Sequence, residues 1–191
     1  HVNERVVALD TQALMLCFQL DGASFETADV RDLNDWHAKL NGAWRNLADD
    51  RLAVWHHVVR REHAGYPAGR FRSGFAADLD ARYRARLGDA RMFVNELYVT
   101  LVLHPSRDAA DHAGAWLAGR SGRPQETDET ALARLEDAGR DLAQYLARYA
   151  ARPLTVYERG GQAFSAPMEL IGLLLTGRQA PVPLVRGHLG S

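Results

Sequence analysis

Hydrophobic residues along this chain alternate at a period of two in some segments and recur every three or four residues in others. Alternation predicts two short strands over residues 5–10 and 13–20, and the strongest strand over residues 92–104. Residues 51–61 carry apolar side chains on both faces, which is typical of a strand covered on both sides. We therefore expect this strand to be central in its sheet.

Helical spacing follows directly after residues that can cap a helix. Thr27 or Asp29 can cap one helix and Ser73 another. The first apolar stripe consists of Val30, Leu33, Trp36, Leu40, Trp44 and Leu47. The second helix has a predicted buried face of Phe75, Leu79, Tyr83 and Leu87.

The carboxy-terminal half adds two helices and a strand. Apolar spacing predicts a long helix over residues 128–150, a short strand over 154–157, and a helix over 167–176 that Ser165 caps. The polar residues 105–127 predict a loop. Strands and helices in this order predict an α+β fold, with a mixed, largely antiparallel sheet backed by helices.

Composition narrows the class of protein. The 191 residues are 47% hydrophobic and 25% charged, which excludes disorder as the main description and indicates one domain or two very small ones; we take residues 1–191 as a single domain. Basic and acidic residues nearly balance, 23 against 24, so we expect no direct nucleic-acid contact. The longest apolar stretch, residues 168–175, is too short to span a membrane. Cys17 lies in an apolar run and is expected to be a core residue.

The sequence offers no convincing catalytic, cofactor or metal site. A phosphate-binding loop needs Gly-Lys-Ser/Thr, but the only lysine, Lys39, stands between an alanine and a leucine. The densest titratable cluster lies between His56 and His63. His56 and His57 are adjacent, so on a strand they point to opposite faces and cannot readily share one metal ion. A metal-dependent hydrolase or nuclease that uses His57, Glu62 and His63 stays open as the alternative function.

Two surfaces are candidates for binding a partner. The last predicted helix is apolar on nearly every side, which implies burial either in the core or against another chain. Its candidate interface residues are Leu170, Ile171, Leu173, Leu174 and Leu175. A group of arginines, Arg82, Arg84, Arg86 and Arg91, could form a basic face, although exposed arginines on a helix are usually only solvated.

Three phrases of the sequence carry a family resemblance. They are VWHHVVRR at residues 54–61, FAADLDARY at 75–83 and FVNELYVTLV at 93–102. In this order and spacing they resemble the amino-terminal domain of the CagE/TrbE/VirB family of ATPases, which act in type IV secretion and conjugative DNA transfer. Weaker similarity extends over nearly the whole chain.

The resemblance implies an excised amino-terminal docking domain, without catalysis of its own, of a bacterial motor whose RecA-like carboxy-terminal domain would bind ATP and Mg. Such a domain is expected to link the motor to other inner-membrane and cytoplasmic subunits of the secretion apparatus. The full-length protein is expected to self-associate and to lie in the cytoplasm, peripherally on the inner membrane. No nucleotide-binding residue of the family can be carried over, because no position of this chain matches one.

Overall fold

The computed structural model describes residues 1–184 except 64, 67–68, 89–90 and 106–128. The loop predicted over residues 105–127 therefore lies almost wholly outside the described residues. The elements in chain order are β1 (Val6–Ala8), β2 (Leu14–Leu20), α1 (Val30–Leu47), β3 (Leu52–Glu62), α2 (Gly74–Gly88), β4 (Phe93–Leu103), α4 (Glu129–Tyr145), the 3-10 turn η2 (Ala147–Tyr149), β5 (Arg152–Pro153), β6 (Val156–Arg159), β7 (Gln162–Ser165) and α5 (Ala166–Thr176).

The chain divides into two compact units. The first comprises His1–His57 and Tyr98–Ser191, and the second comprises Val58–Leu97. Strands β3 and β4 each contribute residues to both units, whereas α2 belongs wholly to the second.

Antiparallel pairing organises the sheet of the first unit. The strand order is β1-β2-β4-β3, and β5 pairs with β2. Strands β1 and β5 both run antiparallel to β2. The His104 amide donates to the Arg51 carbonyl at 2.8 Å, so the end of β4 meets the beginning of β3. The predicted α+β class with its largely antiparallel sheet is confirmed.

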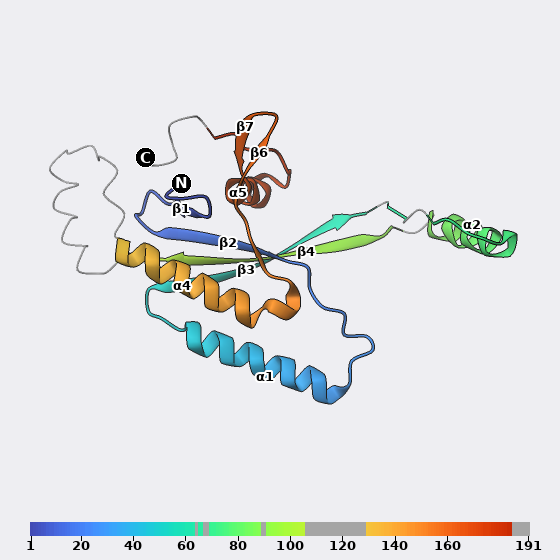
Figure 1. The fold of residues 1–191 in the computed structure, drawn as a ribbon, viewed down its shortest axis with the longest axis horizontal. Helices are drawn as coiled ribbons and strands as arrows, with labels where there is room; N and C mark the ends of the chain where they lie inside the picture. The colour runs from blue at the N-terminus through green and yellow to red at the C-terminus, as the bar shows by residue number, and fades with distance from the viewer. Residues whose placement is uncertain (64, 67–68, 89–90, 106–128, 185–191) are drawn as a thin grey trace. The chain divides into compact units, whose positions relative to one another are not determined.

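The main core lies between this sheet and two helices. The alternating face of β2 contributes Leu14, Leu16 and Phe18, and α4 contributes Leu135 and Leu142. Helices α1 and α4 lie on one side of the sheet, and α5 with the β6–β7 hairpin lies on the other (Figure 1). Helix α4 therefore buries its predicted apolar stripe at Leu135 and Leu142, and α1 buries the end of its stripe at Leu47.

Glycine brings α4 unusually close to β2. A Cβ built at Gly139 would overlap with Leu16 Cδ2 and lie 3.3 Å from Phe18 Cζ. The missing side chain therefore permits this approach of helix and strand.

The opposite face of β2 is buried as well. Cys17 is fully buried there, and its thiol accepts a hydrogen bond from the Thr100 hydroxyl at 3.5 Å. Burial raises the pKa of Cys17 from 9.0 to about 11, and the bond from Thr100 offsets only part of this rise. The thiol is accordingly a neutral core group, as its apolar sequence context predicted.

The helix-capping predictions can be compared with the structure directly. Ser73 Oγ accepts a bond from the Ala76 amide, and Ser165 Oγ accepts one from the Met168 amide, each at 3.2 Å. Both serine caps are confirmed. Asp29 occupies the N-cap of α1, although its side chain forms no capping bond.

Two predictions of local structure are wrong. Strand β3 is not central but lies at the edge of the sheet, paired with β4, and apolar residues on both its faces, such as Val54 and Trp55, are exposed. The face of α2 predicted to be buried is exposed over Phe75, Leu79 and Tyr83. The strand predicted over residues 154–157 is present as β6, two residues further along, and its hairpin partner β7 was not predicted.

Candidate docking surfaces

Helix α5 is capped by hydrogen bonds at both of its ends. At its beginning, the Ser165 hydroxyl caps the helix and lies 2.6 Å from Nε2 of His1. At its end, Gly177 adopts a left-handed conformation with φ +69°, and its amide donates to the Leu173 carbonyl at 2.8 Å. The contact of Ser165 with His1 ties the beginning of the helix to the amino-terminal segment.

A carboxylate on α5 joins the helix to the neighbouring hairpin. Glu169 Oε1 accepts bonds from the Tyr157 hydroxyl at 2.7 Å and from the Val182 amide at 3.3 Å. The bond to Glu169 is the main reason why the pKa of Tyr157 is raised. The Tyr157 ring also stacks on Phe164, with centroids 5.5 Å apart.

The five candidate interface residues of α5 fall into two groups. Leu170 and Leu173 are buried, and Ile171 is partly buried. Leu174 is 38% exposed and Leu175 is 80% exposed. The first three side chains therefore help to anchor the helix, and the last two are exposed at its end.

Helix α2 contacts the rest of the second unit through Tyr66. The Tyr66 hydroxyl donates to Asp80 at 2.7 Å, its ring lies 6.2 Å from that of Tyr83, and the Arg84 guanidinium lies 4.6 Å above it. The bond to Asp80 is the main cause of the raised pKa of Tyr66. These contacts hold the helix by a polar and aromatic edge and leave its apolar stripe uncovered.

Exposed apolar side chains are concentrated in this second unit. Seven of the fourteen large hydrophobic side chains that are exposed among the described residues belong to it, although it has only 40 residues. They are Val58, Phe71, Phe75, Leu79, Tyr83, Phe93 and Val94. Sequence reasoning found the α2 stripe but assigned it to the core, because periodicity identifies an apolar face without showing what covers it.

The predicted basic group is partly neutralised. Arg91 forms two hydrogen bonds with the Glu62 carboxylate, at 3.2 and 2.9 Å, and Arg84 pairs with Asp80 at 3.3 Å. Arg82 and Arg86 form no ion pair with any described residue.

The histidine cluster does not assemble into a metal site among the described residues. His56 and His63 are exposed, and His57 is partly buried with no hydrogen-bond partner for its Nε2. Burial, and secondarily the charge of His56, lower the pKa of His57. In the part of the chain that the structure describes, no three His, Cys, Asp or Glu side chains lie close enough to hold an ion. No observation therefore favours the hydrolase alternative.

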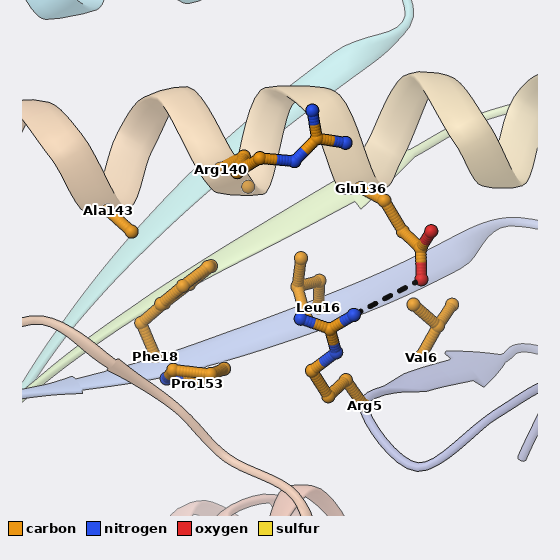
Figure 2. A pocket seen from close by; sticks show the side chains of 9 residues that line it. Arg5, Val6, Leu16, Phe18, Glu136, Arg140, Ala143 and Pro153 are labelled. Atoms are coloured by element: carbon orange, nitrogen blue, oxygen red, sulfur yellow. Dashed lines mark ion pairs between the residues drawn. The ribbon is translucent and has the colours of Figure 1, made fainter.

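A small cavity of about 140 Å³ lies where α4 crosses β2 (Figure 2). Its base is apolar, with Leu16 and Phe18, and its rim carries the Arg5–Glu136 ion pair at 3.7 Å. Pockets that enclose a cofactor or substrate usually measure about 300–1,000 Å³. We interpret this cavity as a packing gap beside Gly139.

No helix among the described residues combines the length and the apolar composition that crossing a membrane requires.

Comparison with known proteins finds a family match and several relatives of the chain. Residues 5–110 match the family described as the N-terminal domain of the type IV secretion system ATPase VirB4/TrbE. The chain is 35% identical to the type IV secretion system protein virB4 of Bartonella henselae over 194 aligned residues. It is 33% identical to the protein virB4 of Agrobacterium fabrum, and 28% identical to the PtlC homolog of Bordetella bronchiseptica, a type IV secretion system protein. Each alignment covers the whole chain but only about a quarter of the relative, 25%, 24% and 24% respectively.

Proposed function

The chain belongs to the family of N-terminal domains of the VirB4/TrbE type IV secretion ATPases, and from this membership we propose that it is the assembly and docking part of such a motor. In this role it links the ATP-driven part of the protein to inner-membrane channel subunits. The observation that carries the proposal is the contrast along α5, whose inner leucines are buried while Leu175 is 80% exposed. Leu174 is exposed beside it, and two adjacent exposed apolar side chains at the end of an anchored helix suit the apolar part of a surface that binds another protein.

Nucleotide chemistry is assigned to the remainder of the protein. The chain spans about a quarter of the length of the relatives it matches, and its single lysine does not stand in a phosphate-binding loop. We assign ATP and Mg binding to a motor domain outside these residues, and no catalysis to the chain itself. Its proposed partners are other inner-membrane and cytoplasmic subunits of the secretion apparatus and further copies of the same protein. We place it in the cytoplasm, peripherally on the inner membrane.

The α5 proposal is tested with two leucine variants of opposite burial. Leu175→Asp should weaken recovery of the whole ATPase with the channel subunits, while the unfolding free energy of the 191-residue chain stays within about 0.5 kcal/mol of wild type, as is usual for surface changes. Leu173→Asp should instead destabilise the chain, because it places a carboxylate in the core. Recovery is measured by affinity purification of the assembled complex.

Ala38→Asp is the matched control, since it adds one carboxylate at an exposed position of another helix, α1. It should leave recovery unchanged. If Leu175→Asp and Ala38→Asp behave alike and the complex assembles normally with both, the end of α5 is not the docking surface.

A further inference from the structure

The second unit presents an apolar stripe bordered by arginines. On α2, Phe75 is 79% exposed and Leu79 is 58% exposed, and these residues with Tyr83 recur every four positions along one face. Arg82 and Arg86 lie beside this face at the same four-residue spacing. We call these five residues the basic stripe.

Further positive charge surrounds the basic stripe. Arg70 and Arg72 are exposed shortly before α2 and, like Arg82 and Arg86, form no ion pair with a described residue. The second unit carries eight arginines against five acidic residues, whereas the rest of the chain carries 15 basic and 19 acidic residues. The nearly neutral chain is thus divided into a basic and an acidic part, and the partner of the stripe should be apolar and acidic.

The first unit carries a surface of that kind at the beginning of α1. Residues 25–35, which we call the acidic segment, include two exposed apolar side chains, Phe25 and Val30, the latter 74% exposed. Four exposed carboxylates, of Glu26, Asp29, Asp32 and Asp35, accompany them together with one exposed arginine, Arg31, so the segment carries a net charge of −3. None of these five side chains forms an ion pair with a described residue.

From this complementarity we infer that the basic stripe of one copy binds the acidic segment of a second copy, so that the chains associate head to tail. Both surfaces have large apolar side chains without cover, and their charges are opposite: two arginines beside Asp78 on the basic stripe, against a net charge of −3 on the acidic segment. Because the two surfaces belong to different parts of the chain, the contact is heterologous, and one copy can bind two neighbours. The inference deepens the proposed assembly role and rests on it.

The contact involves few side chains, so its affinity belongs to the weak, transient class. In the full ATPase, other contacts between the same copies would raise its effective strength. Rim charges are screened by salt, and self-association of the chain should therefore fall as ionic strength rises.

A charge-swap experiment on the 191-residue chain tests the inference by sedimentation equilibrium, at protein concentrations on the order of 100 µM, as a weak contact requires. Wild type should show a mass that increases with concentration. Arg82→Glu/Arg86→Glu makes the basic stripe acidic, so both surfaces of this variant are acidic. Glu26→Arg/Asp29→Arg makes the acidic segment basic, so both surfaces of that variant are basic. Each variant alone should associate about tenfold or more weakly than wild type, since like charges then face each other.

An equimolar mixture of the two variants should recover association, because every contact in it can pair unlike charges. Arg159→Glu/Arg178→Glu is the control, since it makes the same change of net charge at exposed positions outside both surfaces and should associate like wild type. Circular dichroism and urea unfolding verify that all variants are folded.

Three results would overturn the inference. A wild-type chain that stays monomeric shows that the surfaces do not bind each other. Variants that associate like wild type, or a mixture that stays as weak as its components, exclude the head-to-tail pairing. Binding to vesicles of anionic phospholipid that Arg82→Glu/Arg86→Glu abolishes, without any self-association of wild type, assigns the basic stripe to a membrane surface. None of these results bears on the Leu175 test, so the docking proposal is judged separately.

Discussion

Helices α4 and α2 show how similar sequence patterns lead to different surroundings. Both carry large apolar side chains at helical spacing, but Leu135 and Leu142 of α4 are fully buried while no residue of α2 is buried. Helix α4 lies over β2, whereas α2 is held by the Tyr66 edge alone among the contacts described above. An apolar stripe on a helix thus indicates that the face can be buried, but it does not show whether residues of the same chain cover it.

Shortening one leucine in each helix gives the largest expected difference between α4 and α2. Leu142→Ala should lower the free energy of unfolding by about 2–5 kcal/mol, because it opens a cavity in the core. Leu79→Ala makes the same chemical change at an exposed position and should cost less than about 0.5 kcal/mol. Urea denaturation of dilute protein measures both. Equal losses would mean that the chain itself buries α2.

Two glycine substitutions compare a closely packed helix position with an open one inside the first unit. Gly139→Ala should destabilise by about 1–3 kcal/mol, because the new Cβ overlaps with Leu16 and that buried side chain must repack. Gly42→Ala in α1 is the matched control, since nothing lies within 4 Å of its Cβ. It should stabilise by up to about 1 kcal/mol through helix propensity. A stabilising Gly139→Ala would contradict the close packing of α4 on β2.

The smallest effect concerns Cys17 and appears only at alkaline pH. Folding favours the neutral thiol, since its pKa rises from 9.0 to about 11. Its contribution to stability is therefore complete below pH 9 and declines as the pH rises towards about 11, where the unfolded chain already holds a thiolate. Wild type should lose stability relative to Cys17→Ala over this interval, measured by urea unfolding at several pH values. A constant difference between the two proteins would show that the thiol is not desolvated.

Much of the first unit could be predicted because its pattern and its surroundings agree. The alternation in β2, the stripe of α4 and the cap at Ser165 all appear where the sequence indicated. Val30 shows the limit of this reasoning, since it belongs to the predicted stripe of α1 yet is exposed at the first turn of the helix.

The errors arise where tertiary context decides. Strand β3 has apolar residues on both faces, which is typical of a central strand, but it lies at the edge of the sheet. The β6–β7 hairpin was missed although its turn carries a usable signal. Gly160 and Gly161 both have positive φ, +61° and +76°, as two-residue hairpin turns of the commonest kind require.

The candidate surfaces were predictable in part for the same reason. Apolar composition located α5 but could not separate the buried Leu173 from the exposed Leu175, because that depends on how the helix lies against the rest of the unit.

Amide hydrogen exchange tests most directly the central claim that no described residue of the second unit covers the apolar face of α2. A helix of 15 residues with no buried face is only marginally stable in water, so in dilute solution the α2 amides should exchange far faster than those of α4. As the protein is concentrated, α2 and the acidic segment should gain protection together while α4 stays unchanged. Protection of α2 equal to that of α4 in dilute solution would contradict the account.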